Sequence, residues 1–264
     1  MPTTGTRTHH LLRPAAALLA AALLAAAATA CSTDADSDPQ PDHRSFALPG
    51  RTLVVESDNA DLTLTPADGD RVQVERRIKV WKAGGGKPDI SWSMSGDTLH
   101  LKVHCGWGLG SCSVHDLVQV PRGVTVTVHG INGDVDASGF TAPLSIVTTN
   151  GDISASASQG PLSLTSTNGD VSATGIRAAQ TTAGATNGDV DLSFAQAPTG
   201  VRATSSQGDV SLHLPSAASP GYHLDLKSSL GDIVHDGTPD TPGSSHVITA
   251  SSSTGDITLL RDGG

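Results

Sequence analysis

The chain has 264 residues, with 16 basic and 26 acidic side chains and a formal net charge of −10. Removal of residues 1–30, the expected leader, takes away two arginines and leaves a net charge of −12. This excess of acid disfavours nucleic acid as a partner, and it disfavours attraction of the whole domain to anionic lipid through general electrostatics. The remaining length is sufficient for one sizeable domain.

Residues 1–30 have the order of a secretory signal peptide. Arg7 and Arg13 precede an Ala- and Leu-rich run at 15–30, which is shorter than the about 20 residues that a membrane-spanning helix needs. The run ends in Ala-Thr-Ala-Cys31, which resembles a lipobox with Ala28 in place of the usual leucine. This resemblance implies a lipid on Cys31 and attachment to the extracytoplasmic face of the cell membrane. Ordinary signal-peptidase cleavage, which would leave Cys31 as a free thiol, is the alternative.

The segment after the leader is expected to be a spacer. Residues 32–45 are polar and acidic, contain two prolines and show no periodic apolar pattern. Such a composition cannot bury enough apolar surface to fold. Residues 31–45 are therefore predicted to form a lipidated cysteine followed by a flexible tether that holds the domain off the membrane.

From residue 46 onward the chain has the pattern of β-strands. Apolar and polar residues alternate strictly at 71–80 and 98–103, and a turn at Arg122-Gly123 separates two further alternating runs. Alternation over four to eight residues with Gly and Asp between the runs is typical of strands. Residues 46–130 are thus predicted to form an N-terminal β region with a hairpin.

An internal repeat dominates residues 131–264. Gly-Asp followed by Val or Ile recurs seven times, at intervals of 18, 18, 19, 20, 23 and 24 residues. The seven pairs are Gly133 and Asp134, Gly151 and Asp152, Gly169 and Asp170, Gly188 and Asp189, Gly208 and Asp209, Gly231 and Asp232, and Gly255 and Asp256. The first four follow Asn132, Asn150, Asn168 and Asn187. The next residue is always apolar: Val135, Ile153, Val171, Val190, Val210, Ile233 and Ile257.

A period near 20 residues with one apolar column in register predicts a solenoid. We therefore expect residues 131–264 to form a parallel β-solenoid, a β-helix or β-roll of about six to seven short coils, continuous with the N-terminal β region. The coils would stack about 4.8 Å apart with the apolar column pointing inward. A sandwich of short antiparallel hairpins is the alternative.

The Asn-Gly-Asp repeats, together with the Val-Pro-Arg-Gly-Val-Thr-Val stretch at 120–126, resemble the putative adhesin family of β-strand-repeat bacterial envelope proteins. The resemblance covers the chain from about residue 50 to its end. It implies a repeated β fold and a surface location, and adhesion is the expected function. It transfers no catalytic residue, because the family has no established active site.

Cys105 and Cys112 flank a glycine-rich segment in a chain that we expect to be exported, where thiols oxidise. Alternation places each cysteine on the apolar face of its strand, so a hairpin that joins the two strands would bring the sulfur atoms together. A structural disulfide between them is predicted. The alternative is a metal site with His104 and His115, but each histidine points to the face opposite its neighbouring cysteine.

The repeat aspartates have a simple role in the turns. Asn-Gly supplies a corner with positive φ, and the Asp side chain caps nearby backbone amides. Stacked carboxylates would lie about 5 Å apart, which requires solvent or a cation between them. The period and motif differ from the nine-residue calcium-binding repeat of secreted β-rolls. No metal and no other cofactor is predicted.

The repeat region offers little for catalysis. It contains three aromatic and four basic residues, and it has no nucleophile elbow, P-loop or dinucleotide-binding motif. A glycan-acting β-helix enzyme is therefore disfavoured. We expect a non-catalytic binding or adhesion module whose partner is a surface or envelope protein or glycan. An envelope structural or stress-response lipoprotein that associates with other membrane proteins is the alternative.

Overall fold

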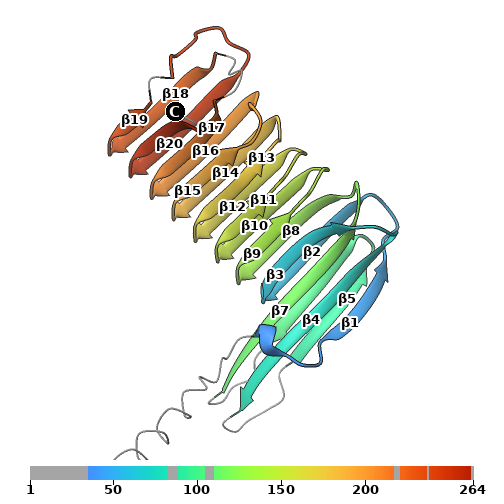
Figure 1. The fold of residues 1–264 in the computed structure, drawn as a ribbon. Helices are drawn as coiled ribbons and strands as arrows, with labels where there is room; N and C mark the ends of the chain where they lie inside the picture. The colour runs from blue at the N-terminus through green and yellow to red at the C-terminus, as the bar shows by residue number, and fades with distance from the viewer. Residues whose placement is uncertain (1–34, 83–88, 105–109, 217–220, 237, 263–264) are drawn as a thin grey trace, which may run out of the picture. The chain divides into compact units, whose positions relative to one another are not determined.

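The computed structural model describes residues 35–82, 89–104, 110–216, 221–236 and 238–262, which form a two-sheet parallel β-solenoid (Figure 1). The predicted fold class is confirmed. The element η1 (Ala35–Ser37) is a single 3-10 turn, and no helix in the described residues is long and apolar enough to cross a membrane. The predicted leader and Cys31 lie outside the described residues.

Two sheets face each other across the core. The eleven-stranded sheet contains, in spatial order, β1 (Asp42–Ala47), β4 (Arg71–Lys82), β7 (Gly110–Pro121), β3 (Asp61–Ala67), β9 (Val135–Ser138), β11 (Ile153–Ser156), β13 (Val171–Ile176), β15 (Val190–Phe194), β17 (Val210–Pro215), β21 (Ile257–Asp262) and β19 (Ile233–His235). The ten-stranded sheet contains β18 (His223–Leu230), β20 (Val247–Thr254), β16 (Gly200–Gln207), β14 (Gln180–Asn187), β12 (Leu162–Asn168), β10 (Leu144–Asn150), β8 (Thr125–Asn132), β2 (Thr52–Asn59), β6 (Thr98–His104) and β5 (Asp89–Ser95).

Each coil places one strand in each sheet. A longer strand runs through the ten-stranded sheet and ends, in five of the eight coils, at an asparagine. The corner follows, Gly-Asp in seven coils, and a shorter strand returns through the eleven-stranded sheet. Neighbouring coils pair in parallel and in register, so that Leu144 lies beside Leu162 and Ile153 beside Val171. The pairing of β13 with β15 has one shift in register, between Ala173 and Ile176. Like residues therefore stack on like residues along much of the ladder.

The solenoid begins earlier than the sequence indicated. β2 and β3 form a coil at residues 52–67, and they pair in parallel with β8 and β9 of the next coil. Its corner is Asn59-Ala60-Asp61, followed by the buried Leu62. This is the repeat motif with alanine in place of glycine. Eight two-strand coils can thus be traced in the described residues, one or two more than predicted.

The last two coils exchange places in the stack. β20 and β21 insert between the coil of β16 and β17 and the coil of β18 and β19, so the terminal coil is not the last one in the sequence. The inserted coil has fully buried inward residues, including Ile257 and Leu259. The terminal coil instead has Ile233 at 41% exposure and an exposed His235 in the same two columns. A polar residue in an inward column is tolerated at the end, where only one neighbour covers it.

The apolar column predicted from the repeats forms the core in six of its seven members. Val135, Ile153, Val171, Val190, Val210 and Ile257 are at most 2% exposed. Ile233 is the exception, for the reason given above. The second apolar patch of each coil faces the column from the ten-stranded sheet, as Leu144, Ile146, Leu162 and Leu164 show.

Truncating a central member of the column should destabilise the fold. We expect Val171→Ala to lower the free energy of unfolding by about 1–3 kcal/mol, because it removes fully buried methyl groups between two neighbouring coils. Its neighbour Ser172 points outward, and Ser172→Ala should change the value by no more than about 0.5 kcal/mol. Denaturant melts measure both, and equal shifts of the two midpoints would show that the column is not a core.

A different arrangement closes the N-terminal end of the stack. β4 and β7 pair antiparallel and join the eleven-stranded sheet beside β3, while β5 and β6 form a hairpin in the ten-stranded sheet beside β2. The hairpin of β5 and β6 is not the one that the sequence predicted. β6 and β7, which we expected to pair with each other around the glycine-rich segment, belong to different sheets. Each of them instead extends the edge of one solenoid sheet.

Candidate functional site

Side-chain amides form a continuous ladder at the corner that precedes each glycine. The Nδ2 atom of each asparagine donates to the Oδ1 atom of the asparagine in the preceding coil, at 2.7–2.9 Å. The ladder runs through Asn59, Asn132, Asn150, Asn168 and Asn187 and is continued by Gln207. Parallel stacking without a register shift explains why this position carries an amide: each side chain then both donates and accepts.

The repeat aspartates form a second ladder, and it links coils rather than closing a turn within one coil. The Oδ1 atom of each aspartate accepts a hydrogen bond from the backbone N–H of the aspartate in the next coil, at 2.7–3.1 Å. In spatial order the ladder contains Asp61, Asp134, Asp152, Asp170, Asp189, Asp209, Asp256 and Asp232. The last two follow the exchanged order of the terminal coils.

Acidic charge gathers along this edge of the stack. Beside the ladder, burial and then the negative charge of Asp134 raise the pKa of the Asp136 carboxyl above its ordinary value. The described residues contain no group of three or more His, Cys, Asp or Glu side chains that could hold a metal ion. The aspartates therefore act on the backbone as hydrogen-bond acceptors.

The corner glycines allow the coils to approach closely. Gly169 has a φ of +151°, and a Cβ atom placed on it would lie 2.2 Å from the carbonyl oxygen of Gly151. Gly151, Gly188, Gly208, Gly231 and Gly255 are in the same situation, with the backbone of the neighbouring coil in the way. Ala60 differs because its other side faces β6 and β7, which lack the Gly-Asp corner of the repeats; it packs in a small cluster with Val103 and Val114.

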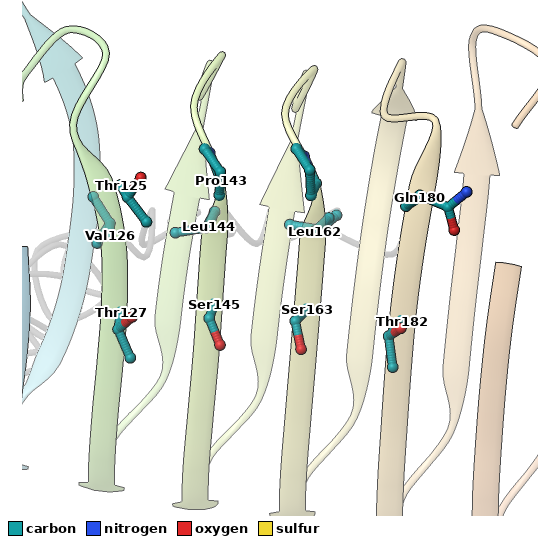
Figure 2. Close-up of a pocket in the computed structure, with 11 residues that line it drawn as sticks. Thr125, Val126, Thr127, Pro143, Leu144, Ser145, Leu162, Ser163, Gln180 and Thr182 are labelled. Carbon is teal, nitrogen blue, oxygen red and sulfur yellow. The ribbon is translucent and has the colours of Figure 1, made fainter. Parts of the chain in front are cut away.

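A shallow groove crosses the outer face of the ten-stranded sheet and spans four coils (Figure 2). It has a volume of about 270 Å³. Along its floor the hydroxyl-bearing side chains of Thr127, Ser145, Ser163 and Thr182 lie side by side on β8, β10, β12 and β14. None of the eleven residues that line the groove is charged. The row is bounded by Val54 at one end and by Arg202 at the other.

Two prolines form the wall of this groove. Pro143 and Pro161 precede β10 and β12, and each carbonyl accepts a hydrogen bond from the coil before it, from Val126 N–H and Leu144 N–H. A proline is tolerated at the start of a strand because the amide it lacks is not required there. Gln180 takes the corresponding place at β14 and adds a polar amide to the rim. The groove thus combines an apolar wall with a regular row of hydroxyls.

A buried ion pair joins two neighbouring strands of the eleven-stranded sheet at the N-terminal end. Arg76 on β4 and Asp116 on β7 are 1% and 0% exposed and make two parallel hydrogen bonds of 2.6 and 2.7 Å. The Arg76 guanidinium also donates to the carbonyl of Ser91 on β5 and lies 5.0 Å from the ring centre of Trp92. Arg44 of β1 approaches the same ring at the same distance. Burial raises the pKa of the Asp116 carboxyl, an effect that the Arg76 charge opposes.

The segment predicted to be a tether is bound to the domain over much of its length. Residues 42–47 form β1, which pairs antiparallel with β4. Asp36 contacts His115 at 2.7 Å and Arg77 at 3.2 Å, and the hydrogen bond from His115 holds the pKa of this carboxyl below its ordinary value. Asp38 accepts a hydrogen bond from the backbone N–H of Ile78. The polar composition that indicated a tether instead supplies carboxylates that bind the edge of the sheet.

A protein-family model matches most of this architecture. The family model described as Toastrack DUF4097 matches residues 51–260, about four fifths of the chain. The chain belongs to the Toastrack DUF4097 family. The matched range starts at the coil of β2 and β3 and includes β4 to β7, which close the N-terminal end of the stack. The Toastrack domain is therefore the whole stack rather than the seven glycine-containing repeats alone.

Two solved structures are similar to the Toastrack domain. A putative adhesin from Bacteroides fragilis has 14% sequence identity and a TM-score of 0.52, with 85% of this chain and 98% of that chain covered. A putative cell adhesion protein from Clostridium sporogenes has 10% identity and a TM-score of 0.38, with 84% and 100% covered. At this identity the Bacteroides fragilis structure supports the fold alone. No curated protein matches the chain.

Of the two cysteines predicted to form a disulfide in the Toastrack domain, the structure describes one. Cys112 on β7 is half-buried and disulfide-bonded. Cys105 and Cys31, the other two cysteines of the chain, lie outside the described residues, so the pairing of Cys105 with Cys112 stays a prediction.

Alkylation of the mature chain without reductant tests this pairing. We expect mass spectrometry to find Cys105 and Cys112 unlabelled and joined in one cross-linked peptide, because both are expected to face an oxidising compartment. After reduction both should be labelled. Full labelling of both before reduction, or a cross-linked peptide that contains Cys31, would refute the predicted pair.

Proposed function

We propose that the protein is a non-catalytic binding module of the bacterial cell surface, held at the membrane by a lipid on Cys31, and that it binds its partner through the groove on the ten-stranded sheet. The observation that carries this proposal is the uncharged row of hydroxyls across four coils, bordered by two prolines. The name of the Bacteroides fragilis structure, a putative adhesin, agrees with this class of function. The lipobox-like end of the leader supports the anchor.

The groove favours a particular kind of partner. Its hydroxyls recur at the spacing of neighbouring strands, about 4.8 Å. Such a row can exchange hydrogen bonds with an extended chain that carries repeated hydroxyl or amide groups. Because the lining residues are neutral, a highly charged polymer would lose its hydration without gaining an ion pair. An uncharged stretch of an envelope glycan or protein meets both conditions.

Binding of the labelled mature chain to isolated cell envelopes tests the site. We expect Ser145→Arg combined with Ser163→Arg to abolish most of the binding, because two large charged side chains would fill the groove. Ser154 and Ser172 are the matched control, since they are register partners on the outer face of the opposite sheet. Their replacement by arginine adds the same charge and should leave binding unchanged. Equal loss in both variants would exclude the groove as the site.

The anchor is tested separately by fractionating cells that express Cys31→Ser. We expect this variant to appear in the medium or to remain unprocessed, because the thioether that carries the lipid cannot form. The wild-type chain should stay with the membrane. Normal cleavage of Cys31→Ser together with membrane retention would exclude the lipid anchor.

A second function, association with another envelope protein, is favoured by the far end of the stack. The terminal coil exposes Leu230 at 70% and Val234 at 52%. The register partners of Val234 along the eleven-stranded sheet are polar in the other coils, for example Thr258 and Ser211. Exposed apolar groups at an open sheet edge are typical of protein contacts. If Leu230→Ser with Val234→Ser, rather than the groove variant, removes envelope binding, this second function replaces the first.

A further inference from the structure

Three side chains on the outer face of the eleven-stranded sheet form a hydrogen-bonded chain. The Nε2 atom of His115 lies 2.9 Å from the Thr63 hydroxyl oxygen, and its Nδ1 atom lies 2.7 Å from a carboxylate oxygen of Asp36. Thr63 is on β3, His115 is on the neighbouring β7, and Asp36 is in the η1 turn. A hydroxyl, an imidazole and a carboxylate in this order are the parts of an activated nucleophile.

The carboxylate determines which nitrogen of the imidazole carries the proton. The hydrogen bond from His115 holds the pKa of the Asp36 carboxyl below its ordinary value, so this group is ionised at neutral pH and can only accept. Nδ1 of His115 therefore donates, and in the neutral ring the lone pair of Nε2 faces the Thr63 hydroxyl. Arg77 donates to the same carboxylate at 3.2 Å and holds it from a second side. His115 is thus placed to take the proton of Thr63.

Neighbouring carboxylates favour this proton transfer. Asp61 on β3 is the register partner of His115, and Asp136 on β9 is the register partner of Thr63. Their negative charges stabilise the imidazolium that forms when His115 accepts a proton. The interaction is reciprocal: burial and then Asp134 raise the pKa of the Asp136 carboxyl, and the charge of His115 opposes this rise.

A groove beside Thr63 has room for a small acyl group. It has a volume of about 160 Å³, roughly the space of five water molecules, and residues of β1, β3, β4 and β7 line it. Leu117, the register partner of Thr63 on β7, gives the groove an apolar surface. Gln73 and Gln119 are register partners on β4 and β7, and their amides offer N–H donors to a carbonyl oxygen. The nucleophile, an apolar surface and hydrogen-bond donors thus lie in one place.

From this arrangement we propose that Thr63 accepts an acyl group from a short-chain carboxylic ester. The Thr63 oxygen bonds to the carbonyl carbon of the ester while its proton passes to Nε2 of His115. The bond from that carbon to the alcohol oxygen then breaks, and the leaving alcohol takes the proton from His115. The products are an acyl ester on Thr63 and a free alcohol. One such transfer per molecule adds a covalent step to a non-catalytic binding module, on the sheet opposite its proposed binding groove.

Reaction of the mature chain with p-nitrophenyl acetate tests the proposal. We expect mass spectrometry of the digested protein to find an acetyl group on Thr63, formed at least about a hundredfold faster than on Thr65, because a general base contributes about 10²–10⁴. Thr65 is the internal control, since it lines the same groove two residues further along β3. Equal acetylation of the two threonines would overturn the proposal.

Two variants test the nucleophile and the base. His115→Gln should slow the acetylation of Thr63 by about a hundredfold or more, because the amide fills a similar place but cannot take the proton. Thr63→Val should remove the acetylated site. Envelope binding by Thr63→Val should equal that of the wild type, so this proposal and the proposed function succeed or fail separately. An unchanged rate of Thr63 acetylation in His115→Gln would overturn the proposal.

Asp36 is a positioning residue, because it contacts His115 and not the reacting atoms. Asp36→Ala should slow the acetylation of Thr63, and it should remove the strongly downfield proton resonance that an imidazole N–H bonded to a carboxylate gives in NMR spectra. Asp68→Ala is the control, since it removes an exposed ion pair with Arg122 and should change neither the rate nor the resonance. If Asp36→Ala leaves both unchanged, the carboxylate does not orient His115 and the proposed chain of three groups is wrong.

Discussion

Replacing Gly169 with alanine is expected to lower the free energy of unfolding by at least about 4 kcal/mol. The φ of +151° is a conformation that an alanine adopts only with strain, which costs about 1–3 kcal/mol. The added Cβ atom would also lie 2.2 Å from the carbonyl oxygen of Gly151. Relief of that clash requires two coils to separate, which would weaken the backbone, asparagine and aspartate ladders at this level. Denaturant melts of the variant give the value.

Gly69 supplies the matched control for this prediction. Its φ is +124°, and a Cβ atom on it would have nothing within 4 Å. Gly69→Ala should therefore show the backbone strain without the clash, a loss of about 1–3 kcal/mol. The difference between the two variants measures the close approach of the coils. If both variants lose the same free energy, the coils do not approach as closely as the structure has them.

Removal of one member of the buried ion pair should have a similarly large effect. We expect Asp116→Ala to cost about 3–5 kcal/mol, because it leaves the Arg76 guanidinium buried without its carboxylate partner. The remaining contacts, with the Ser91 carbonyl and the Trp92 ring, do not neutralise the charge. Chemical denaturation at neutral pH measures the loss. A loss below about 1 kcal/mol would mean that Arg76 reaches solvent.

A double replacement separates the charge effect from packing. Arg76→Met with Asp116→Leu removes both charges while it keeps most of the volume between the sheets. Replacement of a buried ion pair by apolar residues is often neutral or stabilising. We therefore expect the double variant to be more stable than Asp116→Ala by several kcal/mol. If the double variant is as unstable as the single one, the loss reflects packing against Trp92 rather than an unpaired charge.

The repeat predicted the fold well because the strands, the corners and the buried column all recur with its period. A parallel stack in register requires one residue type per position, so the inward column and the corners of 131–264 could be read directly from the sequence. The groove could not be predicted from the sequence. In the sequence, Thr127, Ser145, Ser163 and Thr182 are ordinary outward-facing residues of four separate strands. Only their alignment across the sheet makes them a surface.

Three features differ from the prediction for physical reasons. Ala60 stands where the other corners have glycine, because β6 and β7 on its far side lack the Gly-Asp corner of the repeats, and this substitution concealed the first coil. The order of the last two coils depends on which of two similar repeats is better buried. The polar His235 in an inward column was the one sign in the sequence that its coil lies at the end. The tether was misjudged because polar composition reports the lack of a core and not the hydrogen bonds that Asp36 and Asp38 make with the sheet edge.

The stacking order of the coils determines which residues meet in the asparagine and aspartate ladders, and engineered disulfides test this order most directly. Ser211 on β17 lies beside Thr258 on β21, and Val234 lies one coil further along the stack. Neighbouring parallel strands are about 4.8 Å apart, which is within the range that a disulfide spans, whereas two steps are about 10 Å. The account predicts that Ser211→Cys with Thr258→Cys forms a cross-linked peptide on mild oxidation, and that Ser211→Cys with Val234→Cys does not. The reverse result, a cross-link between positions 211 and 234 alone, would show that the coils stack in sequence order and would contradict the account.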